Sequence, residues 1–219
     1  MAFAALPRLS FARPSQPQPA DAGITPGRVK ADARRMHEAT LAADLLPERP
    51  AEGEAVHTLM SGRYDLAQVV TATVRRWPVS RLTVATLSAN KRTLRELLNE
   101  LDAGTVGTLA VVVSGFFARH NKELFQADRE EILTDHPGST LIAAKTHAKI
   151  TLFEFADGSC PLVFEGSANL RKNDSLEQLT AIRDRSVFDW HRRWIDALVT
   201  AHANDPIGDE EDGDDPHEE

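Results

Sequence analysis

The sequence predicts an α/β domain, with a mixed, mostly parallel β-sheet flanked by helices on both faces and disordered N- and C-terminal tails. Three observations lead to this fold class. Segments typical of strands and of helices alternate along residues 54–203. One strand-like segment is apolar throughout, as in a strand that is buried on both faces. The prolines gather near the N-terminus and the acidic residues at the C-terminus, so neither end has the composition of a packed core.

Four helices are predicted where apolar residues recur on one face of a helix. In the first helix Leu66, Val69, Val70 and Val74 have this spacing, and Pro78 ends it. Gly104 follows the second helix, as is typical of a helix end. The predicted helices span residues 64–77, 90–103, 121–134 and 187–203.

Five strands are predicted between these helices. Residues 81–88 are rich in β-branched side chains, and residues 109–117 are the continuous apolar segment. Three more strands follow closely, and a turn at Asp157-Gly158-Ser159 indicates that two of them form a hairpin. They span residues 140–155, with a break or bend near Thr146, 162–165 and 176–182. The hairpin is the reason to expect a mixed sheet.

The composition divides the chain into three parts. Residues 1–53 are rich in Pro, Ala and Arg and are expected to be a largely disordered arm, in which residues 26–43 have the composition of a short helix. Residues 54–203 are the predicted domain. Residues 204–219 are expected to be a disordered acidic tail, or one that competes with an anionic substrate for a positive cleft. Without the nine acidic residues of the tail, the formal charge of −8 becomes about +1, because 24 acidic residues face 25 basic ones.

The composition also excludes several classes of protein. The single cysteine, Cys160, cannot form an internal disulfide, so a reducing, cytoplasmic compartment is expected. The longest nearly unbroken apolar stretch, residues 109–118, has half the length of a membrane span, and Pro7 and Arg8 interrupt the apolar start that a signal peptide needs. We therefore expect no integral membrane association. Aromatic residues make up 6% of the chain, which argues against a stacking-rich sheet for single-stranded nucleic acid.

Two short segments carry groups that suit phosphoryl chemistry. His147 and Lys149 lie two residues apart in a strand-like run, so both side chains are expected to project from the same face. Residues 166–169, with the sequence Gly-Ser-Ala-Asn, end the next strand and offer a close backbone approach, a hydroxyl and an amide. Glu177 follows in the last strand.

These groups can cleave a phosphodiester without a metal or another cofactor. The His147 imidazole is a nucleophile for phosphorus, and Lys149, Ser167 and Asn169 can bind the phosphate oxygens. Glu177 can hold the other ring nitrogen and stabilise the imidazolium. Taken alone, His147 would be an ordinary strand histidine. It is interpreted as a site residue because the lysine, serine, asparagine and glutamate named above accompany it.

A second segment of the same spacing, His120-Asn121-Lys122, is interpreted as surface. It lies at a junction between a loop and a helix, and no Gly-Ser-x-Asn sequence closely follows it.

The pattern around His147 resembles the signature of the phospholipase D superfamily, which is His-x-Lys, a downstream acid, and then Gly-Ser-x-Asn. The segment HAKITLFEFADGSCPLVFEGSANL matches it, and the likeness extends more loosely over residues 55–203. The chain looks most like the short, single-motif members found in phages and bacteria. The resemblance implies a role for each site residue: His147 as the nucleophile or general acid, Lys149 and Asn169 as phosphate ligands assisted by Ser167, and Glu177 as the group that buttresses His147.

The chain departs from the family pattern in two places. Glu154 stands seven residues after His147, where the family has an aspartate, and the gap to Gly166 is longer than usual. The longer gap predicts an extended hairpin around Asp157 and Cys160.

The family chemistry uses two histidines, and this chain has one complete motif. The resemblance therefore implies a homodimer whose two-fold axis passes through the active site. The expected function is a metal-independent phosphodiesterase that forms a phosphohistidine and acts on nucleic acid. Two alternatives stay open. One is a hydrolase or transferase of phospholipids or small phosphodiesters from the same superfamily, and the other is a non-catalytic module that binds phosphate or DNA.

Overall fold

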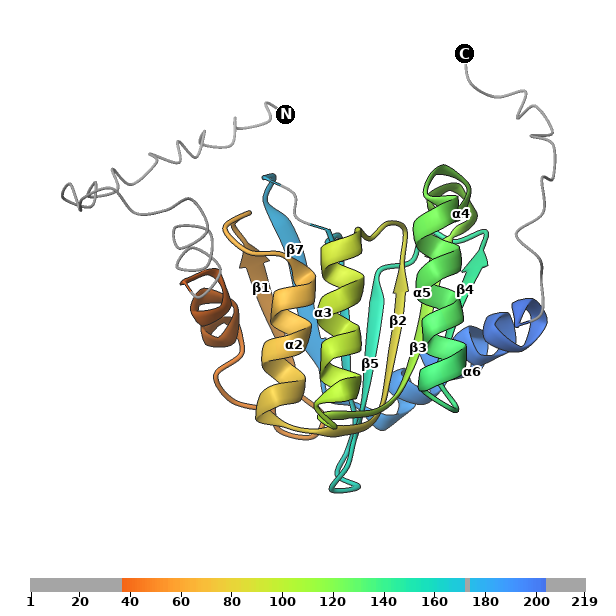
Figure 1. Cartoon of the computed structure of the whole chain (residues 1–219). Helices are drawn as coiled ribbons and strands as arrows, with labels where there is room; N and C mark the ends of the chain where they lie inside the picture. The colour runs from red at the N-terminus through yellow and green to blue at the C-terminus, as the bar shows by residue number, and fades with distance from the viewer. Residues whose placement is uncertain (1–36, 172–173, 204–219) are drawn as a thin grey trace, which may run out of the picture.

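The computed structural model describes residues 37–171 and 174–203. Within them, one sheet has the strand order β1-β7-β6-β5-β2-β3-β4 (Figure 1). The strands are β1 (Ala55–Met60), β2 (Val79–Thr86), β3 (Val106–Ser114), β4 (Thr140–Ala144), β5 (Ile150–Phe155), β6 (Leu162–Gly166) and β7 (Glu177–Ile182).

The sheet is mixed, as predicted. β3 pairs in parallel with β2 and β4, whereas every pair that involves β5 or β7 is antiparallel. It follows from these pairings that β1, β2, β3, β4 and β6 run in one direction, and β5 and β7 run in the other. β5 and β6 form the predicted hairpin.

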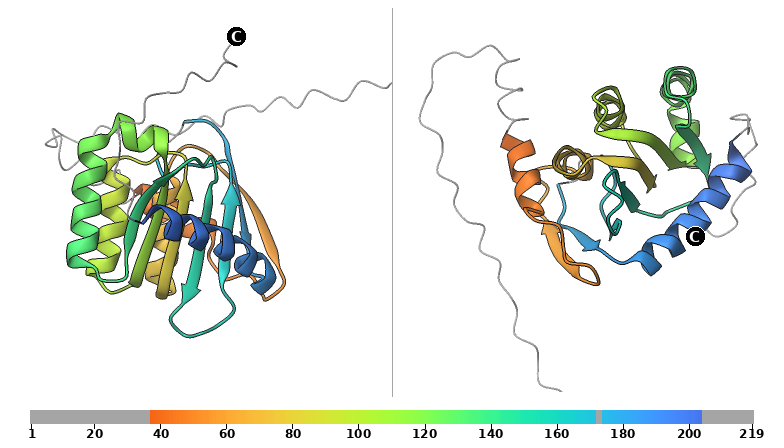
Figure 2. Two further views of the ribbon diagram at one scale, coloured as in Figure 1. Left: turned by 90° about the vertical axis from the view of Figure 1, so that its right-hand side faces the viewer. Right: turned by 90° about the horizontal axis from the view of Figure 1, so that it is seen from below.

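Helices cover both faces of the sheet, which confirms the predicted layers (Figure 2). α2 (Leu66–Arg76), α3 (Lys91–Asp102) and α5 (Lys122–Asp135) lie on one face, and α6 (Arg185–His202) lies on the other. Each face has its own apolar cluster: Val111 of β3 belongs to the larger one, and Val112 belongs to the one under Phe188 and Ile195 of α6. Neighbouring residues of the central strands thus point to opposite faces, and apolar side chains fill both.

Local sequence determines where the first helices begin. Asp65 accepts a hydrogen bond from the Gln68 N–H, and the Gln68 side chain accepts one from the Asp65 N–H, both at 3.0 Å. This capping box closes the first turn of α2, and Asn90 and Thr93 form another at the start of α3. Pro78 follows α2 closely and prevents the helix from continuing.

Glu154, which stands where the family has an aspartate, holds α6 on the sheet. It lies near the end of β5, and Arg192 of α6 forms an ion pair with it at 2.5 Å. In the neighbouring strand β2, Arg81 forms an ion pair with Asp196 of α6 at 2.6 Å. These contacts lie at the opposite end of β5 from His147, so they give Glu154 a structural position.

The structure corrects three expectations about the elements. β1 was not predicted, because its mixed sequence AVHTLM contributes only Met60 to the fully buried core. Residues 115–117 belong to a helix, α4 (Gly115–His120), rather than to the preceding strand, because the Ser114 hydroxyl accepts the Phe117 N–H at 3.0 Å and starts a helix there. Residues 140–155 form two strands that are not neighbours, since β4 lies at an edge of the sheet and β5 lies between β6 and β2.

Residues before the expected domain boundary at residue 54 also pack on the core. Residues 37–45 are helical, and Ala42 and Leu46 are buried in the larger apolar cluster. The predictions for residues 1–36 and 204–219 lie outside the described residues. No helix in the described part of the chain is both long and apolar enough to cross a membrane.

Candidate active site

Five connections of the chain lie at one end of the sheet, across the ends of its strands. We call this end of the sheet the site edge. Five strands end there, namely β1, β2, β3, β4 and β6, and two strands begin there, namely β5 and β7. The pairing of residues places these strand ends side by side: Met60 pairs with Glu177, Gly166 with Leu179, and Ser114 with Ala144. The site edge is defined as these connections and the first residue of the element that each one enters: residues 61–66, 87–91, 115–122, 145–150 and 167–177. All five predicted site residues lie at it, namely His147, Lys149, Ser167, Asn169 and Glu177.

His147 and Lys149 lie in the connection between β4 and β5 and not within a strand, which corrects the prediction that a strand aligns their side chains. The chain must cross the ends of β3 and β2 between those two strands, and residues 145–149 make this crossing. His147 is exposed and Lys149 is half-buried. The Lys149 Nζ donates a hydrogen bond to the backbone carbonyl of His147 at 3.0 Å. The two residues are therefore linked through the backbone.

The Gly-Ser-Ala-Asn segment follows β6, the neighbour of β5. A side chain on Gly166 would clash with the Gln178 carbonyl of β7, so glycine permits the close approach of the two strands. The Ser167 N–H donates to that carbonyl at 3.0 Å, and the Gln178 N–H donates to the Ser167 hydroxyl at 3.0 Å. Ser167 is thus fixed against β7 by both its backbone and its side chain.

Asn169 is positioned by Thr86, a residue that the sequence analysis missed. Thr86 is buried at the end of β2, and its hydroxyl lies 3.4 Å from Asn169 Oδ1 and 3.1 Å from the Ser88 carbonyl. The same hydroxyl accepts the Leu170 N–H at 3.4 Å. The single Thr86 hydroxyl proton is shared between the Ser88 carbonyl and Asn169 Oδ1, and when it is donated to Oδ1 the Asn169 NH₂ group is left as a donor. A threonine as the last residue of a buried strand gave no distinguishing signal in the sequence.

Glu177 accepts a hydrogen bond from the Ser167 hydroxyl. The predicted contact between Glu177 and the His147 ring is not made: among the described residues, 37–171 and 174–203, the imidazole has no hydrogen-bond partner. The reason is the register, because Glu177 begins β7 directly beside the end of β6, whereas His147 precedes β5 by three residues. The structure therefore brings Glu177 to Ser167 rather than to His147.

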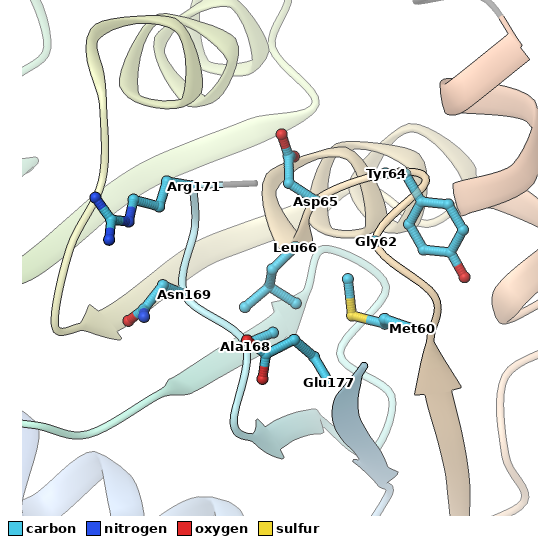
Figure 3. Close-up of a pocket in the computed structure, with 9 residues that line it drawn as sticks. All are labelled: Met60, Gly62, Tyr64, Asp65, Leu66, Ala168, Asn169, Arg171 and Glu177. Atoms are coloured by element: carbon cyan, nitrogen blue, oxygen red, sulfur yellow. The ribbon is translucent and has the colours of Figure 1, made fainter. Parts of the chain in front are cut away.

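A pocket lies beside Asn169 and Glu177, between the ends of β1 and β6 and the start of α2 (Figure 3). In Figure 3, Met60 and Leu66 point into its middle, and Asn169 and Arg171 extend to one side of the chain that leaves β6. The pocket thus joins an apolar floor to polar groups of the predicted site. Within the described ranges, no three His, Cys, Asp or Glu side chains are grouped so that they could hold a metal ion.

The site edge has a positive charge although the chain as a whole has a formal charge of −8. Among its described residues, the basic ones outnumber the acidic ones by seven to three. The basic residues are Arg63, Lys91, Arg119, Lys122, Lys145, Lys149 and Arg171, and the acidic ones are Asp65, Asp174 and Glu177. The sequence could not reveal this concentration, since the seven residues come from five separate connections. Such an edge attracts polyanions.

Comparison with known proteins gives matches among solved structures. No family model matches the chain, and no curated protein matches it. The phospholipase D family member Nuc from Salmonella typhimurium has 12% sequence identity, and the match covers 68% of this chain and 97% of Nuc with a TM-score of 0.49. NucT from Helicobacter pylori has 13% identity, and the match covers 68% of this chain and 98% of NucT with a TM-score of 0.51. The chain has a phospholipase D fold.

A third solved structure covers more of this chain. TrmBL2, an archaeal chromatin protein whose structure shows a mode of DNA binding, has 11% identity; the match covers 80% of this chain and 62% of TrmBL2 with a TM-score of 0.49. This chain and NucT are 13% identical in sequence, and what they share is the fold. In the phospholipase D fold of this chain, the His-x-Lys and Gly-Ser-x-Asn segments lie at the ends of the adjacent strands β5 and β6.

Proposed function

We propose that the protein is a metal-independent phosphodiesterase of the phospholipase D type, which acts on nucleic acid through a phosphohistidine at His147. One observation carries this proposal. The two segments lie next to the same ends of the neighbouring strands β5 and β6, where Ser167 donates a hydrogen bond to Glu177 and Thr86 lies beside Asn169. This gives one nucleophile and several donors for phosphate oxygens at a single edge.

The proposed reaction has two displacement steps. In the first, a ring nitrogen of His147 forms a bond to phosphorus while the bond from phosphorus to the leaving oxygen breaks, and that oxygen receives a proton from a general acid. In the second, water gives a proton to the group that acted as the general acid and bonds to phosphorus as the phosphorus–nitrogen bond breaks, which regenerates both the imidazole and the acid. Lys149 and Asn169 stabilise the charge on the equatorial oxygens, so these protein groups supply the electrostatic stabilisation.

The general acid is proposed to be His147 of a second copy. One imidazole cannot begin the reaction both neutral, as a nucleophile requires, and protonated, as an acid requires. Two copies related by a two-fold axis supply both forms at one site. The exposed position of His147 supports this proposal, because a second chain can approach it there.

The charge of the site edge supports nucleic acid as the substrate. A polyanion extends beyond the phosphate that is cleaved, so several basic residues along the edge can contact its other phosphates. The seven basic residues of the site edge come from all its connections and are spread along it, beyond the two strand ends that hold His147 and Asn169.

The test is turnover by the purified protein in EDTA, with single-stranded DNA, plasmid, RNA and a chromogenic phosphodiester as substrates. We expect nucleic acid to be cleaved in EDTA, and His147→Ala to lower the rate by at least about 10²-fold. The matched control is His136→Ala, since His136 lies at the opposite edge of the sheet, 3.6 Å from Asp102. Loss of activity in EDTA with recovery in magnesium or zinc would contradict the proposal, as would a normal rate in His147→Ala. Turnover of the chromogenic diester alone would favour a lipid or small diester as the substrate.

A module that binds phosphate or DNA without turnover is the second candidate. The observation that favours it is the His147 ring, which no hydrogen bond from the described residues orients, whereas catalytic imidazoles are commonly held in one tautomer by a partner. Such a module would bind DNA equally well as wild type and as His147→Ala, and neither would cleave it.

A further inference from the structure

The short helix α4 presents an aromatic ring to solvent. Phe116 is 61% exposed, although burying a phenylalanine stabilises a fold by about 1.5–3 kcal/mol. The next residue, Phe117, is buried in the larger apolar cluster and anchors the helix. Phe117 is thus the buried anchor of α4, whereas the Phe116 ring is available at the surface.

His120 supports the Phe116 ring from one side. The ring centroids of the two residues are 3.9 Å apart and the planes are inclined by 31°. His120 is one helical turn after Phe116, and its Nδ1 lies 2.9 Å from the Phe116 backbone carbonyl, which holds the imidazole in place. His120 thus covers part of the Phe116 ring, and most of the Phe116 side chain stays exposed to solvent.

The pair belongs to the site edge. Ser114, which immediately precedes α4, pairs with Ala144, and the crossing segment that contains His147 begins one residue after Ala144. Counted along these two connections, the Cα atoms of Phe116 and His147 are separated by at most about 23 Å. Figure 1 shows α4 at the end of the sheet where β2 and β3 finish. A strand of nucleic acid bound at His147 can reach Phe116 within a few nucleotides.

Three basic residues stand on α4 or on the elements next to it. Arg119 belongs to the same helix, Lys122 begins the next helix, and Lys145 is exposed at the end of the adjacent strand β4. An aromatic face beside cations is the combination that binds single-stranded nucleic acid, in which the cations follow the phosphates and the ring stacks on a base. A duplex offers no open base face to such a ring, because its bases are stacked on one another.

We propose that Phe116, supported by His120, is a stacking platform for an unpaired base of a single-stranded nucleic acid substrate. The inference rests on the proposed function and specifies its substrate class. It also gives a role to the His120-Asn121-Lys122 segment, which copies the spacing of the catalytic motif without its Gly-Ser-x-Asn partner.

Fluorescence anisotropy with a labelled oligothymidine and an abasic oligonucleotide of equal length and charge tests the platform in EDTA. Phe116→Ala should weaken binding of the oligothymidine by about 5- to 150-fold, which corresponds to the loss of one stacked base. Binding of the abasic strand should fall much less, because that strand has no base to stack. Phe116→Trp should restore most of the affinity, since it also offers an aromatic face. The matched control is Trp190→Ala, which removes another exposed aromatic ring, located on α6.

Two results would overturn the inference: equal affinity of wild type and Phe116→Ala for the oligothymidine, or equal losses on the two strands. A change from dimer to monomer in Phe116→Ala, seen by sedimentation, would also overturn it and identify the ring as a subunit contact. The failure of the proposed function is distinguishable, because it appears as the absence of turnover in wild type whatever the binding of the oligothymidine.

Discussion

Gly166 of β6 lies so close to Gln178 of β7 that a Cβ atom on it would stand 3.0 Å from the Gln178 carbonyl carbon and closer still to the carbonyl oxygen. That oxygen accepts the Ser167 N–H, so the close approach and the placement of the Ser167 hydroxyl depend on each other. Gly166→Ala should lower the free energy of unfolding by about 1–3 kcal/mol and also abolish turnover, because β7 must move away from Ser167. Chemical denaturation and kcat/KM in EDTA measure the two effects.

The control for this substitution is Gly158→Ala. Gly158 has a φ of +70°, and a Cβ atom on it would meet no heavy atom within 4 Å, so alanine is strained there only by its backbone. Gly158 lies in the hairpin turn remote from the site edge, and we expect its substitution to lower stability while kcat/KM stays unchanged. If Gly166→Ala were as active as wild type, the placement of Ser167 by β7 would have no catalytic importance.

Thr86 is expected to act on the reaction through Asn169. Thr86→Val keeps the shape of the side chain but removes the hydroxyl that lies 3.4 Å from Asn169 Oδ1, so the amide loses its orientation. We predict a loss of about tenfold in kcat/KM, equal to about 1.4 kcal/mol. In an Asn169→Ala background the same substitution should have little further effect, and this double-mutant cycle distinguishes positioning from a general loss of stability.

Thr83→Val is the matched control for the cycle, because Thr83 is a buried threonine of the same strand and is not at the site edge. Additive losses in the double variant would mean that Thr86 and Asn169 act independently.

Much of this fold followed from periodicity, and the site followed only in part. The spacing of Leu66, Val69, Val70 and Val74 predicted α2 within two residues of its observed bounds. The apolar run that predicted β3 also extended it wrongly, since Phe117 is buried by a helix and periodicity does not distinguish a short buried helix from a strand. Which apolar residues are buried was therefore easier to predict than which element buries them.

For the candidate site, the motif selected residues that all lie at one end of the sheet, but it did not predict which of them are in contact. His147 and Lys149 were expected on a strand, and they lie on a crossing segment because β4 and β5 are separated by β2 and β3, an order that the local sequence does not encode. Glu177 meets Ser167 because of the pairing between β6 and β7, which is likewise a property of the whole sheet.

Asp128 of α5 provides a prediction about stability and pH. Burial raises the pKa of this carboxyl, and the attraction of Arg95, 4.0 Å away, opposes that rise without cancelling it. One of its oxygens, Oδ2, is buried without a hydrogen-bond partner among the described residues. The ionised form therefore destabilises the folded state at neutral pH, and Asp128→Asn should raise the Tm at pH 7.

The pH dependence of this effect has a definite sign. The pKa of Asp128 is higher in the folded state than in the unfolded state, so the destabilisation by the ionised carboxylate is lost as the pH falls through the folded pKa. Below the unfolded pKa, near 3.8, the carboxyl is protonated in both states. The advantage of Asp128→Asn should accordingly be present at pH 7 and vanish near pH 3. Thermal unfolding at several pH values measures it, with Glu130→Gln as an exposed control on the same helix. An advantage that is independent of pH would contradict the electrostatic origin.

The shared site makes a quantitative prediction for mixed dimers. When wild type and His147→Ala chains exchange freely in equal amounts, about a quarter of the dimers contain two intact histidines under random pairing. Activity per total protein should then fall to about a quarter of the wild-type value, compared with about a half if each chain works alone. A value near one half, or an active monomer, would exclude the shared site.

The most direct measurement is to trap the covalent intermediate on His147. Wild-type protein is stopped during turnover of a labelled single-stranded oligonucleotide in EDTA, and its peptides are analysed by mass spectrometry at neutral pH, because a phosphorus–nitrogen bond hydrolyses in acid. We predict a phosphoryl-linked fragment of the substrate on the peptide that contains His147, and no such adduct in His147→Ala. Turnover at the normal rate without any adduct on that peptide, or an adduct on another residue, would contradict the central claim.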